Sequence, residues 1–72
     1  MIGTPLLNEL RDRIIPTEAV GHPNYIELRS YYTKMRGYVR VLEKDQKDRV
    51  AEKGLNEVLE KITEIETRMG LK

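Results

Sequence analysis

The sequence predicts an all-α fold: an antiparallel helical hairpin over about residues 24–44 and 48–69, with a short helix over about residues 5–14 packed on it. Three observations predict this class. Apolar residues recur at alternating steps of three and four along two long segments. A segment without any apolar side chain, residues 43–49, separates the two. Charged residues make up 35% of the chain, yet the net charge is only +1, which is typical of a folded helical protein rather than a disordered tail.

The first predicted helix begins at a Thr-Pro pair. Thr4 supplies a capping hydroxyl. Pro5 suits the first helical position, because the backbone N–H that proline lacks would have no hydrogen-bond partner there. Leucines and isoleucines follow at helical spacing until Pro16, whose ring pushes Ile15 away from helical geometry. Residues 16–23 contain two prolines and a glycine, which indicates a connector. A helix of about ten residues is unstable alone, so this one must pack on the rest of the chain.

Two longer helices follow. Asn24 stands three residues before Glu27, a spacing that indicates a capping box at the start of the second helix. The apolar seam of that helix consists of Tyr25, Leu28, Tyr32, Met35, Val39 and Leu42. The seam of the third helix consists of Ala51, Leu55, Val58, Ile62, Ile65 and Met69. Gly70 is the expected stop of the third helix.

A reversal of the chain at residues 44–48 places every apolar residue of one seam opposite an apolar residue of the other. The predicted pairs are Leu42 with Ala51, Val39 with Leu55, Met35 with Val58, Tyr32 with Ile62, Leu28 with Ile65, and Tyr25 with Met69. A reversal at Gly54 would instead leave Ile62 and Ile65 facing lysines. Burying a large apolar side chain contributes about 1.5–3 kcal/mol, whereas a glycine inside a helix costs about 1 kcal/mol. The turn at 44–48 is therefore favoured.

Charged residues flank the two seams. Residues 25–42 contain four basic residues and one acidic residue, a net +3, and residues 49–69 contain four basic and five acidic residues, a net −1. The predicted register places Arg36 opposite Glu57 and Arg29 opposite Glu64. Such pairs help to fix an antiparallel register, although each exposed pair contributes only about 0–1 kcal/mol.

Length and composition narrow the classes of function. We expect residues 1–72 to form a single small helical domain, whose core is marginal at this size. Cysteine is absent and His22 is the only histidine, so we expect no disulfide, no metal site, no cofactor and no catalytic centre. His22, in the connector, is interpreted as an ordinary polar residue. We expect no membrane span, a cytoplasmic location, and a bacterial or phage accessory protein as the source.

The main functional candidate is a stripe beside the seam of the second helix, formed by Tyr31, Lys34, Tyr38 and Val41. Three interpretations remain open for it. The stripe is a dimer contact, for which tyrosine is typical; it receives the first helix through its leucines and isoleucines; or it is a basic, aromatic surface for nucleic acid.

These residues predict a small non-enzymatic protein–protein interaction or regulatory module. It would dock on a larger protein or associate with itself, as a homodimer in which two hairpins form a helical bundle. The alternative function is a small nucleic-acid-binding regulator that uses the basic residues of the second helix: Arg29, Lys34, Arg36 and Arg40. Four basic residues in a chain of near-neutral charge make this the weaker hypothesis, because affinity for nucleic acid depends on how many phosphates are neutralised.

Overall fold

The computed structural model describes residues 3–71 and confirms the predicted all-α class. Its elements are α1 (Thr4–Asp12), a short 3-10 turn η1 (Thr17–Ala19), α2 (Tyr25–Lys44) and α3 (Arg49–Arg68), with no strand among the residues described. The molecule is elongated, with principal extents of 36 × 19 × 18 Å. Met1, Ile2 and Lys72 lie outside the described residues.

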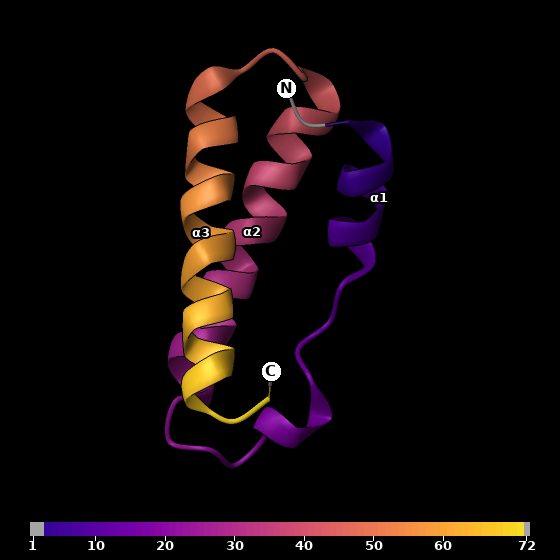
Figure 1. The fold of residues 1–72 in the computed structure, drawn as a ribbon. Coiled ribbons are helices and arrows are strands. Elements are labelled where there is room, and N and C mark those ends of the chain that lie inside the picture. Colours follow the sequence, from indigo (N-terminus) through magenta and orange to yellow (C-terminus); the bar gives the residue numbers. More distant parts are fainter. Residues whose placement is uncertain (1–2, 72) are drawn as a thin grey trace.

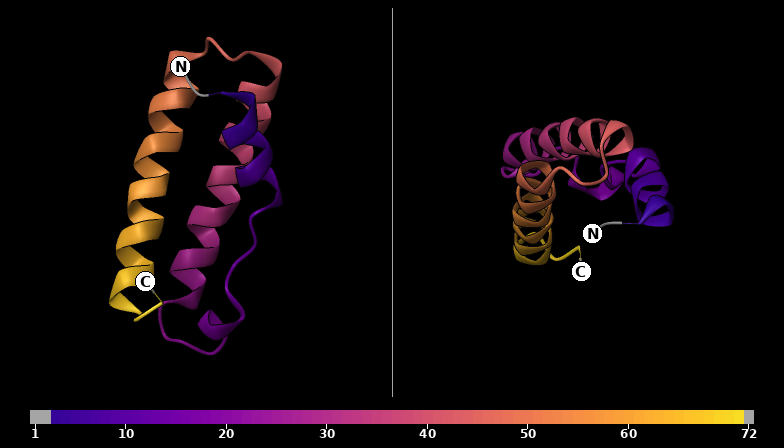
Figure 2. Two further views of the ribbon diagram at one scale, coloured as in Figure 1. Left: turned by 45° about the vertical axis from the view of Figure 1, so that its right-hand side comes forward. Right: turned by 90° about the horizontal axis from the view of Figure 1, so that it is seen from above.

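The central helix is α2. Figure 1 shows α3 alongside α2, running back from the connection at residues 45–48, and α1 on the other side of α2. Seen from above in Figure 2, α1 and α3 form two separate arms beneath α2. The contact of α2 with α3 is much more extensive than that with α1.

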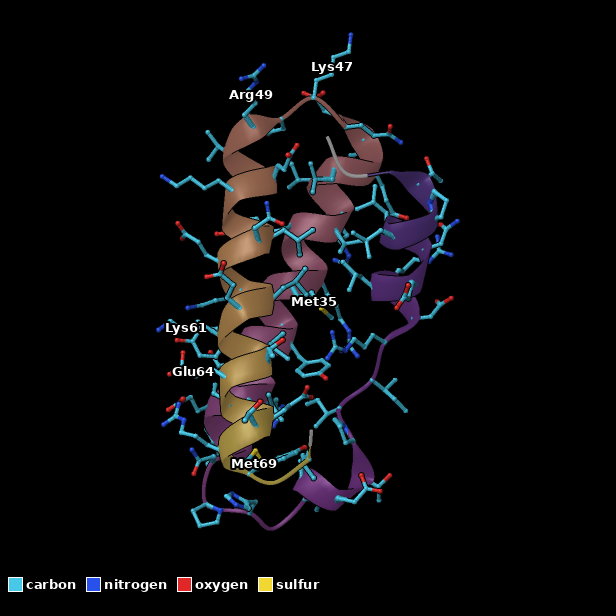
Figure 3. The ribbon with its side chains drawn as sticks, viewed as in Figure 1. Met35, Lys47, Arg49, Lys61, Glu64 and Met69 are labelled. Atoms are coloured by element: carbon cyan, nitrogen blue, oxygen red, sulfur yellow. The ribbon has the colours of Figure 1, made fainter. Side chains whose placement is uncertain are left out.

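Burial follows the predicted seams closely. Ten of the twelve seam residues are buried, and Tyr25 and Met69, at the far ends, are partly buried against them. Figure 3 shows Met35 near the middle of the bundle and Met69 at its lower end, near the C-terminus. Three residues from the first part of the chain complete the core: Leu7, Leu10 and Ala19. The spacing of apolar residues thus predicted the interior, because helical periodicity alone decides which face of each helix can be buried.

The first helix ends two residues earlier than predicted and begins one residue earlier. Gly3 occupies the cap position, and the Thr4 hydroxyl accepts a hydrogen bond from Gln46 Nε2 at 3.0 Å instead of capping the helix. Arg13 is already extended, with φ −69° and ψ 132°. Pro16 therefore does not determine the end of α1, because the backbone leaves the helix three residues before it.

The connection between the two long helices lies within the segment predicted as a turn, residues 44–48. Residues 45–48 join α2 to α3, and Asp48 caps α3 by accepting a hydrogen bond from the Ala51 N–H at 3.0 Å. Asp45 Oδ1 accepts from the Lys47 N–H at 3.1 Å within the turn itself. The rival turn at Gly54 is wrong, since α3 continues through that residue.

Gly70 ends α3 as predicted. Its φ of +79° lies in the left-handed region, which favours glycine. The Gly70 N–H donates to the Thr67 carbonyl at 3.1 Å, and the Leu71 N–H donates to the Glu66 carbonyl at 2.8 Å. These two bonds form a Schellman motif, which folds Leu71 back onto the core.

Candidate functional site

The four residues of the predicted stripe lie where α2 meets the outer edge of α3. The Tyr38 ring covers Gly54 so closely that a Cβ built there would lie 2.6 Å from a ring carbon and 2.8 Å from the hydroxyl oxygen. Lys34 Nζ lies 5.2 Å from the centre of the Tyr31 ring, a cation–π arrangement. Val41 is 42% exposed. Gly54 is therefore explained by packing: only a residue without a side chain lets this tyrosine lie on α3.

Val50 extends this surface from the side of α3. It lies four residues before Gly54, and Val41 lies three residues after Tyr38, so each is one helical turn nearer the connection and on the same side. Val50 is 81% exposed. We call these five residues the outer surface: Tyr31, Lys34, Tyr38, Val41 and Val50. The exposure of Val50 could have been predicted from the sequence. It is an apolar residue that lies outside the buried seam, so packing within the chain does not explain it.

The interpretation that this stripe receives the first helix is wrong. Helix α1 lies on the opposite side of α2, where Arg11 Nη1 donates to Glu43 Oε2 at 3.1 Å. One turn beyond α1, Arg36 Nη2 donates to the Arg13 carbonyl at 3.3 Å. Leu7 and Leu10 are buried in the core, while Leu6 and Ile14 remain exposed. The outer surface is consequently not covered by α1, while its two tyrosines are partly buried against the core.

The four basic residues of the alternative hypothesis do not form one surface. Lys34 belongs to the outer surface, on the side of α3. Arg36 lies on the side of α1 through its bond to Arg13, and Arg29 and Arg40 lie seven and four residues from it on the same side of the helix. The predicted pairs of Arg36 with Glu57 and of Arg29 with Glu64 are not formed among residues 3–71. Glu64 instead pairs with Arg68 at 3.8 Å and with Lys61 at 3.8 Å. Figure 3 labels Lys61 and Glu64, which lie near each other on α3.

A buried polar cluster joins the three helical regions, and the sequence reasoning missed it. The Tyr32 hydroxyl donates to Glu66 Oε2 at 2.7 Å, and Arg13 Nη2 donates to Glu66 Oε1 at 3.1 Å. The Arg13 guanidinium also lies 5.5 Å from the centre of the Tyr32 ring. Glu66 and Tyr32 are each 1% exposed. The cluster therefore ties the segment after α1 to both long helices.

The electrostatics of the cluster favour a neutral Tyr32. Burial raises the pKa of Tyr32 to about 12, and the hydrogen bond to the carboxylate of Glu66 acts in the same direction. Because the phenol keeps its proton throughout the physiological range, it acts as a fixed hydrogen-bond donor rather than as a proton carrier. The spacing could have predicted that Glu66 is buried. It stands four residues after Ile62 and thus on the edge of the buried seam.

His22, in the connector, has a local structural role. His22 Nδ1 accepts a hydrogen bond from the Asn24 N–H at 3.1 Å, so that the imidazole, and not the predicted Asn24 side chain, satisfies a backbone group near the start of α2. Within residues 3–71 no group of three or more His, Cys, Asp or Glu side chains gathers in a way that would hold a metal ion. None of the helices described has the length and apolar character that crossing a bilayer requires.

Compared with protein-family models, curated proteins and solved structures, the chain has no significant match to any of them.

Proposed function

We propose that this protein is a small non-enzymatic interaction module that docks through its outer surface, and that the partner at this surface is a second copy of the chain. In this proposal α2 and α3 form the predicted antiparallel hairpin, and two hairpins pack into a helical bundle. The observation that carries it is the exposure of Val50 and Val41 beside two partly buried tyrosines, on a face that α1 does not cover.

The size of the chain favours self-association. At 72 residues a single core is marginal, and small proteins usually add disulfides, a metal or further subunits. This chain contains no cysteine, and its described residues include no metal-binding cluster. Burial of further apolar surface against a second copy would stabilise such a core.

Charge does not oppose the same partner. Lys34 is the single charged residue among the five of the outer surface, whereas Arg29, Arg36 and Arg40 lie on the side of α1. A two-fold interface brings the same surface of both copies together. Two copies therefore meet through this surface with few like charges between them.

The test compares two sets of exposed apolar residues. Changing both Val41→Glu and Val50→Glu puts charge into the outer surface, while Ile26→Glu is a matched control, because Ile26 is 79% exposed on α2 and lies outside that surface. These substitutions are preferable to Tyr38→Ala, which would uncover Gly54 and weaken the packing of α2 on α3. All three variant positions are solvent-exposed in one copy, so the variants should remain helical by circular dichroism.

Light scattering over a range of concentrations should give the mass of a dimer for the native chain and for Ile26→Glu. The double variant should dissociate at least about tenfold more readily, since burying two unpaired carboxylates should cost more than the ~1.4 kcal/mol that corresponds to a factor of ten. A monomeric native chain that is retained by another protein only while the outer surface is intact would identify docking on a larger protein. A monomer whose complexes are unaffected by the double variant would contradict the docking proposal. The nucleic-acid alternative stays a prediction, and a shift assay at low salt tests it.

A further inference from the structure

A small hollow lies where α1 crosses α2, on the side of α2 away from the outer surface. Its volume is about 220 Å³, and it is lined by Arg11 from α1 and by Arg36, Val39, Arg40 and Glu43 from α2. The floor is apolar, because Val39 is only 1% exposed. Three guanidinium groups thus converge on a site with one low-polarity wall.

Two of the three arginines are held in place by other groups. Arg11 Nη1 donates to Glu43 Oε2 at 3.1 Å, which fixes its guanidinium at the rim. Arg36 Nη2 donates to the backbone carbonyl of Arg13 at 3.3 Å, so that a neutral acceptor orients it without neutralising its charge. Arg40, one turn after Arg36, makes no hydrogen bond or ion pair with any residue from 3 to 71. Its guanidinium is therefore available to a ligand.

The charge of the hollow is strongly positive on a nearly neutral protein. Three arginines less the carboxylate of Glu43 leave a local charge of 3 − 1, or +2. Asp12 also approaches Arg11, with Oδ1 at 3.6 Å from Nε, but its side chain is 78% exposed to solvent and lies outside the lining residues. Neither Arg36 nor Arg40 has an acidic partner in the described chain.

We propose that this hollow binds a phosphoryl group that carries two negative charges, as a phosphate monoester or free phosphate does. A dianion matches the local charge of +2, and guanidinium groups bind phosphate oxygens through paired N–H donors. Arg40 would supply the free donors, and Arg36 and Arg11 would meet the remaining oxygens from the next turn and from α1. This inference is independent of the docking proposal, since the two surfaces lie on opposite sides of α2.

The test is a titration of the full chain with inorganic phosphate at about pH 7.5 and constant ionic strength, followed by the NMR signals of the arginine Nε–H groups. At this pH the phosphate is largely a dianion, since the second pKa of a phosphoryl group is about 6. We expect saturable shifts at Arg11, Arg36 and Arg40. Arg40→Gln should weaken binding about tenfold or more, since a hydrogen bond between charged groups is lost.

Arg29→Gln is the matched control, because Arg29 is also exposed on α2, shares the same side of the helix and lies outside the hollow. It should leave the phosphate affinity unchanged. Equal weakening in the two variants would indicate diffuse attraction along the basic side of α2 and would overturn the site, as would shifts that do not saturate.

A phosphoserine peptide and a short single-stranded DNA are titrated in parallel to separate the sources of the phosphoryl group. Tighter binding of the phosphopeptide, again lost in Arg40→Gln alone, would support a phosphorylated protein as the source. DNA binding that depends equally on Arg29 and Arg40, with no saturable response to phosphate, would overturn the proposal in favour of a nucleic-acid surface.

Discussion

Replacing Tyr32 with phenylalanine removes a single hydroxyl group from the buried cluster and nothing from the apolar packing around it. That hydroxyl donates to Glu66 Oε2 at 2.7 Å, and the carboxylate is 1% exposed. A hydrogen bond to a charged group contributes about 1.5–3 kcal/mol. We therefore expect Tyr32→Phe to lower the free energy of unfolding by about 2 kcal/mol. In a domain of this size the melting temperature should fall by roughly 8–16 °C.

The cost should depend on Glu66, and urea unfolding followed by circular dichroism tests this in a second background. In Glu66→Leu the acceptor is absent; this change is itself costly, because it leaves Arg13 without its partner, so Tyr32→Phe is compared with Glu66→Leu alone. Tyr32→Phe should then cost less than about 0.5 kcal/mol, because the hydroxyl it removes has lost its partner. Equal costs in both backgrounds would refute the assignment of the effect to the Tyr32–Glu66 hydrogen bond.

The same residue predicts a loss of stability in alkali. Its pKa rises from 10.0 to about 12 on folding, chiefly through burial, so the folded state retains the phenol proton more tightly than the unfolded state. The stabilisation is fully present below pH 10 and is lost as the pH rises through about 12. At about 1.36 kcal/mol for each pKa unit, the total is about 2–3 kcal/mol, with roughly half lost by about pH 11. The difference in stability between the native chain and Tyr32→Phe should shrink accordingly; a constant difference would contradict the shifted pKa.

Three further substitutions test local packing by urea unfolding. Gly37→Ala should raise the free energy of unfolding by about 0.5–1 kcal/mol, because α2 gains a better helix former and nothing lies within 4 Å of the added Cβ. Gly54→Ala should gain nothing or lose stability, since its Cβ would meet the Tyr38 ring; equal gains at both glycines would contradict that contact. Asp48→Ala should cost about 1 kcal/mol through loss of the cap on α3, and an unchanged stability would show that the cap hydrogen bond contributes little.

The interior of this fold was predictable and its charged contacts were not. Apolar spacing identified Met35 and Ile62 as core residues, because periodicity fixes the buried face of a helix before any tertiary contact forms. Arg36 was expected to meet Glu57 across the seam and instead binds the Arg13 carbonyl. A long charged side chain can pair with several partners at similar free energy. Which pair forms therefore depends on where the neighbouring segments lie in the folded chain.

The position of α1 illustrates the same limit. A place for the first helix on the side of Tyr31 and Tyr38 was one of three open interpretations of that stripe. Two residues of α3 determine on which side of α2 the first helix lies. Gly54 lets Tyr38 lie on α3, and Glu66 holds Arg13 on the other side. The spacing along α2 therefore identified four residues of the outer surface. Val50 could be added only once the relative positions of α2 and α3 were known.

Parallel affinity capture under native conditions, read by mass spectrometry, tests the central proposal most directly. The tagged native chain, the Val41→Glu, Val50→Glu double variant and the Ile26→Glu control would each be expressed beside an untagged copy. We predict that the native chain and the control retain the untagged copy and that the double variant does not. Retention of the same partners by all three chains would contradict docking through the outer surface.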